Sequence, residues 1–220
     1  MQYKIALAGN PNTGKTTLFK LITGELEPSS GGIYPGKSIK IGYLEQHACA
    51  GSQKTVYDEM ESVFEPLMKK EKRLEELADL IEAGRGDIDA LIAEQNRLHN
   101  EFEDGGGLTY KSRTRSALTG LGFSESDFSL PCSLLSGGQR SKLALGKLLL
   151  SAPDLLLLDE PTSMLDVITQ AQMIDFLRRY QQQHQTAYLF ITHSTALAEQ
   201  FCDEIVKMED GHLLKERNTK

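Results

Sequence analysis

Residues Tyr3 to Gly24 read YKIALAGNPNTGKTTLFKLITG, and this segment is the strongest indication of the fold class. Its opening YKIALA is a short apolar run with the length and flanks of a buried strand. The glycine-rich loop GNPNTGKTT follows at Gly9–Thr17, and an apolar-periodic segment then continues to Gly24. A strand, a GxxxxGK[ST] loop and a helix in this order predict a phosphate-binding loop. We therefore expect an α/β P-loop fold with a mainly parallel sheet flanked by helices.

The residue types of this loop suit phosphate. Its glycines allow successive N–H groups to point at phosphate oxygens, and the start of the helix adds the positive end of the helix dipole. Lys15 is expected to reach the β- and γ-phosphates, Thr16 to place its hydroxyl on Mg²⁺, and Thr17 to contact the α-phosphate side. The predicted nucleotide-binding residues of the loop are Gly9, Asn10, Pro11, Asn12, Thr13, Gly14, Lys15, Thr16 and Thr17.

Two further segments belong to the same pattern. Leu134–Gln139 reads LLSGGQ, and LLLLDEP follows at Leu155–Pro161. Ser136 stands where a helix cap belongs, so the start of its helix should again favour an anionic phosphate. The leucine run of the second segment is typical of a strand inside a parallel sheet. Such a strand would deliver Asp159 and Glu160 to the crevice at which the phosphate loop begins.

These two segments resemble the signature and Walker B segments of ABC-type ATPases. The resemblance implies that Asp159 holds Mg²⁺ through water and that Glu160 polarises the water that attacks the γ-phosphate. In that family the signature of one molecule faces the γ-phosphate bound by another, so the chain should supply half of an active site. The signature residues predicted to contact nucleotide are Ser136, Gly137, Gly138 and Gln139.

Three more positions match the family's pattern. KIGYLEQ, a predicted strand, ends at Gln46, where the family has a glutamine that contacts Mg²⁺ and the attacking water. PTSMLD places Asp166 at the position of an aspartate that communicates across the dimer. AYLFITH ends at His193, which matches a histidine that hydrogen-bonds the γ-phosphate. The resemblance implies that Glu160, His193 and Gln46 are catalytic. It implies that Thr16, Gln46 and Asp159 bind the metal. Asp166 is added to the residues expected to contact nucleotide.

The middle of the chain is expected to be helical. Apolar residues recur at helical spacings in two series, which are joined by Gly84–Asp87, where glycines can reverse the chain direction. Pro66 lacks an N–H donor, so it should begin a new helix or kink the first one. This pattern predicts an antiparallel helical hairpin. The expected domains are an α/β core at residues 1–46 and 136–220 and a helical subdomain at residues 47–135.

Different parts of the chain resemble different relatives. KIGYLEQH, TVYDEM and RSALTGLGF resemble segments of ABC-F proteins, which act on ribosomes and carry a helical arm in this region; an ordinary helical subdomain is the alternative. PTSMLD followed by VITQAQMIDFL resembles peptide- or nickel-importer ATPases. AGNPNTGKTTLF resembles the first box of ferrous-iron-transport GTPases. No Asn-Lys-x-Asp guanine-reading segment accompanies that box, so the GTPase interpretation is not favoured.

Composition indicates the class of protein. The chain has 220 residues, a formal charge of −7, 40% hydrophobic and 25% charged residues, which is ordinary for a globular domain and argues weakly against a broad nucleic-acid-binding face. The three scattered cysteines, Cys49, Cys132 and Cys202, indicate free thiols in a reducing compartment. The start lacks a signal-peptide layout, and no apolar stretch approaches the roughly 20 residues that span a membrane. We expect a cytoplasmic protein without a transmembrane segment.

These observations predict Mg²⁺-dependent ATP hydrolysis in a head-to-tail dimer, formed with a second copy or another ABC domain, and an ABC-F-like association with the ribosome. One alternative is the nucleotide-binding subunit of a transporter, which would need membrane permease partners. Another is a truncated, chimeric or engineered P-loop module with weak or no turnover. It arises because only eight residues precede Gly9, whereas ABC domains place further strands and an adenine-stacking aromatic there. Tyr3 is too close to Gly9 to be assigned the adenine-stacking role. The sequence therefore leaves open whether the chain prefers ATP or GTP.

Overall fold

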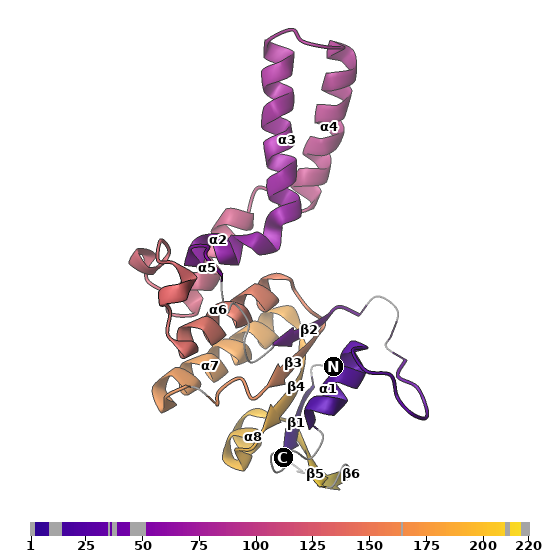
Figure 1. Cartoon of the computed structure of the whole chain (residues 1–220), viewed down its shortest axis with the longest axis vertical. Helices are drawn as coiled ribbons and strands as arrows, with labels where there is room; N and C mark the ends of the chain where they lie inside the picture. The colour runs from indigo at the N-terminus through magenta and orange to yellow at the C-terminus, as the bar shows by residue number, and fades with distance from the viewer. Residues whose placement is uncertain are drawn as a thin grey trace. The chain divides into compact units, whose positions relative to one another are not determined.

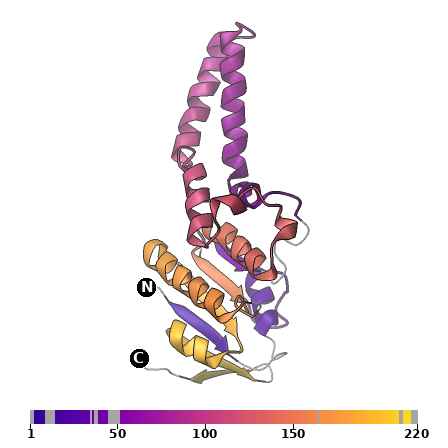
Figure 2. The same ribbon diagram turned by 90° about the vertical axis from the view of Figure 1, so that its left-hand side faces the viewer.

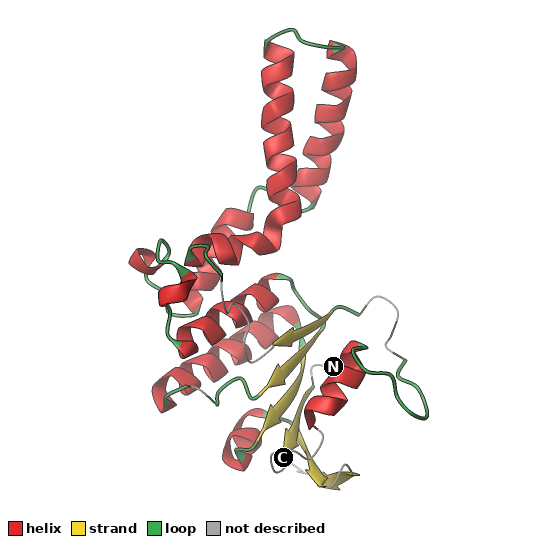
Figure 3. Ribbon diagram, viewed as in Figure 1, coloured by secondary structure: helices red, strands yellow, loops and turns green. Residues whose placement is uncertain are grey.

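The computed structural model of the chain describes residues 3–8, 15–34, 36, 39–44, 52–163, 165–209 and 212–216, without the side chains of residues 15, 16, 215 and 216. Two compact units are present: Met1–Ser52 with Cys132–Lys220, and Gln53–Pro131. The first is built on a β-sheet and the second on helices (Figures 1 and 3). The sequence predicted the boundaries between the α/β core and the helical subdomain at residues 46/47 and 135/136. Within the helical unit, the residues at its two ends pair, because Val56 N donates to the Leu130 carbonyl at 2.9 Å.

Among the residues that the structure describes, the sheet of the first unit has six strands in the order β2-β3-β4-β1-β5-β6. The strands are β1 (Lys4–Ala8), β2 (Ile41–Leu44), β3 (Leu155–Asp159), β4 (Ala187–Thr192), β5 (Glu204–Glu209) and β6 (His212–Glu216). Every neighbouring pair is parallel except β5 with β6, which is antiparallel. The predicted mainly parallel sheet is therefore confirmed, and β1, which leads into the phosphate loop, lies at an interior position.

Helices cover both faces of this sheet (Figures 1 and 2). Leu156 and Leu158 of β3 pack into a cluster that includes residues of α6 (Gly137–Leu150), α7 (Val167–His184) and α8 (Thr195–Phe201). Leu157 points to the other face, where its cluster includes Phe19 of α1 (Lys15–Thr23). A strand buried on both faces needs apolar residues at successive positions, which explains the unbroken leucine run of β3.

The second unit is helical from Val56 onward. Its elements are α2 (Val56–Glu61), the 3₁₀ turn η1 (Ser62–Phe64), α3 (Glu65–Glu82), α4 (Ile88–Asp104), α5 (Tyr110–Gly120) and η2 (Glu125–Asp127). Pro66 lies in the first turn of α3, where its missing N–H has no helical partner to lose. Of the two expectations for Pro66, a new helix or a kink, the structure has the new helix.

The predicted helical hairpin is formed by α3 and α4, which lie antiparallel and side by side (Figures 1 and 2). The chain reverses through Gly84 and Gly86, whose φ angles of 63° and 98° are in the region that favours glycine. Ion pairs join the two helices: Lys70 Nζ lies 2.8 Å from Glu101 Oε2, and Arg73 Nε lies 3.0 Å from Glu94 Oε1.

Glu71 connects the hairpin to α5. Its carboxylate accepts hydrogen bonds from the hydroxyl of Tyr110 at 2.5 Å and from Lys111 Nζ at 2.7 Å. Tyr110 is only 1% exposed, and burial, with the hydrogen bond to Glu71, raises the pKa of its phenol to about 12. The bonds from Lys111 and Tyr110 favour the charged carboxylate and lower the pKa of Glu71. Through these contacts α3 is fixed to α5.

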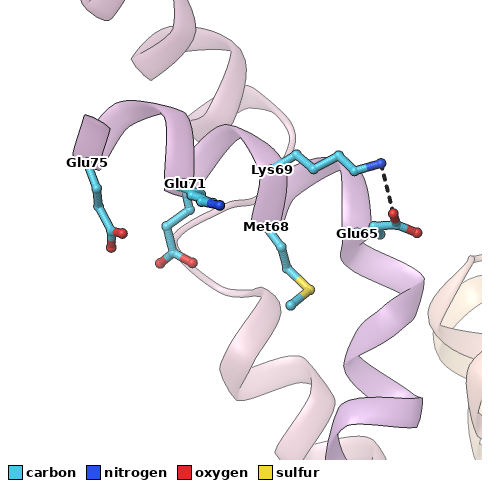
Figure 4. Close-up of a pocket in the computed structure, with 6 residues that line it drawn as sticks. Glu65, Met68, Lys69, Glu71 and Glu75 are labelled. Atoms are coloured by element: carbon cyan, nitrogen blue, oxygen red, sulfur yellow. Dashed lines mark ion pairs between the residues drawn. The ribbon is translucent and has the colours of Figure 1, made fainter. Parts of the chain in front are cut away.

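One face of α3 carries a shallow groove of about 380 Å³, shown in Figure 4. Its lining residues are Glu65, Met68, Lys69, Glu71, Lys72 and Glu75. Two of these lining residues, Lys69 and Glu65, form an ion pair at 2.8 Å, drawn as a dashed line in Figure 4. None of the residues that the sequence predicts for nucleotide or metal binding lines it. Among the described residues, no helix combines the length and the apolar character required to cross a membrane.

Candidate functional site

Three of the predicted site residues, Asp159, Glu160 and His193, lie at the carboxyl ends of the parallel strands β3 and β4. Across the sheet, Asp159 of β3 is paired with Ile191 of β4, and Thr192 of β4 is paired with Ala8 of β1. Asp159 and Glu160 therefore leave the sheet at the same edge as His193, and the predicted phosphate loop follows Ala8 in sequence. In open α/β sheets this edge is where ligands bind.

Glu160 has an uncommon backbone conformation with φ 46°. Hydrogen bonds hold it from both sides, because its N–H donates to the Ile191 carbonyl at 3.1 Å and its carbonyl accepts from Ser163 N at 3.1 Å and Ser163 Oγ at 3.0 Å. Left-handed non-glycine residues cost energy and are concentrated at functional sites. The backbone that carries the predicted catalytic carboxylate is thus fixed by β4 and by the turn that follows.

The side chains of Glu160 and His193 meet. His193 Nδ1 lies 3.3 Å from Glu160 Oε1, and the two side chains are 58% and 24% exposed, respectively. The imidazole therefore stays open to a ligand while one of its nitrogens is within hydrogen-bonding distance of the carboxylate. A carboxylate and an imidazole in this arrangement can take up a proton from water and donate to a developing anion.

Asp159 is the last residue of β3 and is 7% exposed. A carboxylate at the carboxyl edge of the sheet fits Mg²⁺, which prefers oxygen ligands and retains several waters when it binds nucleotide. Within the described part of the chain, no group of three or more His, Cys, Asp or Glu side chains is arranged to hold a metal ion. The fit to Mg²⁺ consequently rests on Asp159 together with two residues whose side chains are not described, Thr16 and Gln46.

The phosphate loop is described only in part. Lys15 and Thr16 begin α1, so the predicted change from loop to helix occurs where the motif places it. Thr17 is exposed in the first turn of this helix. Gly9, Asn10, Pro11, Asn12, Thr13, Gly14 and Gln46 lie outside the described residues. Their predicted contacts with nucleotide and Mg²⁺, like those of the Lys15 side chain, remain predictions.

Ser136 caps the signature helix α6, as its sequence position predicts. Ser136 Oγ accepts from Gln139 N at 3.2 Å, while Ser136 N donates to Gln139 Oε1 at 2.9 Å, so the two residues form a capping box. Arg140 Nη1 also donates to the Leu135 carbonyl at 2.8 Å. A hydroxyl oxygen that accepts from the backbone can still donate its own hydrogen to an anion. The start of α6 therefore offers a fixed donor and a helix dipole.

The starts of α6 and α7 are close together. A Cβ added at Gly138 would lie 2.9 Å from Leu165 Cδ2, and Lys142 Nζ lies 3.4 Å from Gln172 Oε1. Asp166 caps α7, because its two carboxylate oxygens accept from Thr169 N at 2.9 Å and Thr169 Oγ1 at 2.7 Å. These hydrogen bonds lower the pKa of Asp166. In this conformation the Asp166 carboxylate caps α7. Its predicted part in communication across a dimer stays a prediction.

Sequence reasoning missed the residues that support this site. Ser163 holds the carbonyl of Glu160, Thr169 holds Asp166, and Arg140 holds the residue before Ser136. The spacing of Ser136 and Gln139 was a readable signal, since a serine followed three residues later by glutamine is typical of a capping box. No comparable pattern marks Arg140 or Ser163.

Comparisons with known proteins place this geometry in a family. A family model described as ABC transporter matches residues 2–163. ATP-binding protein YdiF of Bacillus subtilis is 38% identical over 206 residues, covering 93% of this chain and 32% of that protein. ABC transporter F family member 5 of Arabidopsis thaliana is 34% identical, covering 94% and 30%. Energy-dependent translational throttle protein EttA of Escherichia coli K12 is 32% identical, covering 94% and 36%. The chain spans about a third of the length of these relatives.

Solved structures agree on the fold. The ATP-binding cassette MJ0796, in a dimeric post-hydrolysis state bound to ADP and Pi, superposes with a TM-score of 0.68 at 21% identity, covering 99% of this chain and 87% of that one. At this identity the likeness concerns the fold alone. The family model, in contrast, extends over most of the chain and includes the phosphate loop, the signature and the Walker B segment. The chain therefore belongs to the ABC transporter family, in which it is an ATP-binding domain of the ABC ATPase type.

Proposed function

We propose that this chain hydrolyses ATP with Mg²⁺ at a site shared with a second ABC domain. The observation that carries the proposal is the pair formed by Glu160 and His193, 3.3 Å apart at the sheet edge where the phosphate loop begins. Glu160 would act as the base for the attacking water, and Lys15, Gln46 and His193 would stabilise charge on the γ-phosphate. Mg²⁺ held by Asp159, Thr16 and Gln46 would supply neutralisation of phosphate charge.

The signature is the reason for proposing a second domain. Ser136 caps α6, and its hydroxyl can donate to an anion as well as accept from Gln139 N. By the resemblance to ABC ATPases, this donor serves the nucleotide of an opposing molecule in a head-to-tail arrangement. The partner would be a second copy of this chain or another ABC domain, and turnover should consequently rise faster than linearly with protein concentration.

The most informative test of this function is Glu160→Gln. The amide cannot take a proton from water, so the variant should bind ATP without turning it over and accumulate as an ATP-bound dimer in size-exclusion chromatography. Glu75→Gln, the same change at an exposed position on α3, serves as the matched control and should turn over ATP as the wild type does. Unchanged turnover in Glu160→Gln would refute the assignment of the base. Titration with GTP in parallel measures nucleotide preference, and we expect ATP to bind more tightly.

In biological terms, we propose an ABC-F-like role in translation. This is supported by relatives named ABC transporter F family member 5 and translational throttle protein EttA, whose similarity covers 94% of the chain and thus includes the hairpin of α3 and α4. We expect Glu160→Gln with ATP to co-sediment with ribosomes through a sucrose cushion. A variant lacking residues 69–100 of the hairpin, with both helices cut to equal length, is the control that should lose co-sedimentation.

The nucleotide-binding subunit of a transporter is the second candidate. The segment Pro161–Asp166, PTSMLD, resembles importer ATPases, and this observation favours it. Such a subunit would co-purify with membrane permeases from detergent extracts and would remain in the supernatant above a ribosome pellet. The two candidates therefore predict opposite results in the co-sedimentation experiment.

A further inference from the structure

The signature turn is held together by three hydrogen bonds, one each between the backbone and the side chains of Ser136, Gln139 and Arg140. Gln139 Oε1 accepts from Ser136 N at 2.9 Å, Gln139 N donates to Ser136 Oγ at 3.2 Å, and Arg140 Nη1 donates to the Leu135 carbonyl at 2.8 Å. Leu135 itself is buried, whereas Ser136 is exposed. The turn is thus anchored in the core by the Leu135 side chain, while the Ser136 hydroxyl next to it is exposed.

We propose that Gln139 and Arg140 are positioning residues for Ser136 and not contacts of the nucleotide. The side-chain oxygen of Gln139 already accepts from the Ser136 backbone N–H at 2.9 Å, so this oxygen is engaged within the turn itself. The half-buried Arg140 guanidinium is likewise used on the carbonyl just before Ser136. Both interactions hold the peptide unit between Leu135 and Ser136, directly before the residue whose hydroxyl is to meet a phosphate.

The physical reason is that a hydroxyl on an exposed turn contributes to a charged transition state only when its direction is set beforehand. Capping-box interactions satisfy orphan N–H groups at a helix start and at the same time fix the backbone of the cap. The bond to Gln139 N occupies one lone pair of Ser136 Oγ and leaves the hydroxyl hydrogen available for donation. The inference rests on the proposed hydrolysis at a shared site.

Two substitutions at residue 139 separate positioning from contact. Gln139→Ala removes the acceptor for Ser136 N, and we expect kcat to fall roughly two- to tenfold with little change in the KM for ATP. Gln139→Glu keeps a carboxyl acceptor at the third helical position, so it should recover most of the lost kcat. A side chain in contact with the phosphates would give the opposite order, because a carboxylate beside them is repelled. Arg140→Met keeps the apolar stem without the donor and should also lower kcat.

A control variant lies in the helical unit. Ser124 and Asp127 form an equivalent capping box on η2, in which Ser124 N donates to Asp127 Oδ2 at 2.7 Å. Asp127→Ala removes this box and should leave kcat unchanged, so a loss confined to residues 139 and 140 cannot arise from losing any capping box. Thermal unfolding of each variant confirms that it is folded before turnover is compared.

The outcomes decide between the inference and the proposed function. Wild-type turnover that Glu160→Gln abolishes, together with wild-type kcat in Gln139→Ala, would overturn the inference and leave the function intact. A Gln139→Glu variant slower than Gln139→Ala would also overturn it, in favour of direct contact. Absence of turnover in the wild-type protein over a range of concentrations would refute the proposed function and this inference with it.

Discussion

His193 Nδ1 and Glu160 Oε1 are 3.3 Å apart, although the two residues follow different strands. The register of β3 and β4 explains the distance. Asp159 is paired with Ile191, and Glu160 N donates to the carbonyl of the same Ile191, so the chain after β3 is directed along the end of β4. The sheet therefore brings a carboxylate and an imidazole together at the edge where the phosphate loop starts.

His193→Ala should impair turnover without impairing folding. The variant removes a donor directed at the predicted γ-phosphate position, a loss that costs roughly a hundredfold in kcat in comparable sites. Because the side chain is 58% exposed, we expect a thermal midpoint close to that of the wild type. Steady-state ATP hydrolysis and a thermal melt on the same samples check the two parts. His212→Ala, at an exposed position in β6, should change neither.

Asp159→Asn should weaken the binding of Mg²⁺. The amide keeps the shape of the buried side chain but removes its charge, so the Mg²⁺ concentration for half-maximal turnover should rise roughly tenfold or more. Chelation with EDTA should abolish turnover of the wild type, and added Mg²⁺ should restore it. Asp175→Asn, which only breaks an exposed ion pair with Arg179 on α7, is the control. An unchanged Mg²⁺ titration in Asp159→Asn would remove Asp159 from the metal site.

Local features of the site could be predicted because they depend on neighbouring residues. The apolar run that ends at Asp159 predicts a strand buried on both faces, and β3 has that environment. Ser136 before an apolar-periodic segment predicts a helix cap, and it caps α6. In the helical unit, glycines at positions 84 and 86 predict the reversal that α3 and α4 make.

Other features depend on contacts between distant parts of the chain. The strand order places β4 between β3 and β1, and only that arrangement sets the distance between Glu160 and His193. The left-handed backbone of Glu160 likewise depends on the Ile191 carbonyl, which no local pattern around residue 160 predicts. The break between α2 and α3 is ambiguous in sequence for a different reason. The spacing of Met60 and Phe64 suits a continuous helix as well as a helix interrupted by a 3₁₀ turn.

Leu157→Ala should destabilise the α/β unit strongly. Leu157 is fully buried on the face of β3 that meets Phe19 of α1, and a leucine truncated in such a core typically costs about 2–5 kcal/mol. Denaturant unfolding followed by circular dichroism measures the loss. Leu214→Ala, at an exposed position on β6, should cost much less. Equal losses in the two variants would contradict burial of Leu157 on the α1 face of β3.

Glu71→Gln should change how the helical unit responds to acid. Lys111 and Tyr110 donate to the Glu71 carboxylate and lower its pKa below the ordinary value of 4.5. The unfolded chain has no such donors, so the stabilisation is complete above about pH 4.5 and is lost as the pH falls through the lower, folded pKa.

At neutral pH we expect Glu71→Gln to lower the free energy of unfolding by about 1 kcal/mol, since the carboxylate is partly exposed. As the pH falls below the lowered pKa of Glu71, the two proteins should converge, because protonation removes from the wild type the charge that the substitution has already removed. Amide hydrogen exchange of α3 and α5 follows this unit separately from the sheet. Glu75→Gln, on the same helix, corrects for general acid effects, and a constant difference between wild type and Glu71→Gln at all pH values would show that these contacts are not linked to the charge of Glu71.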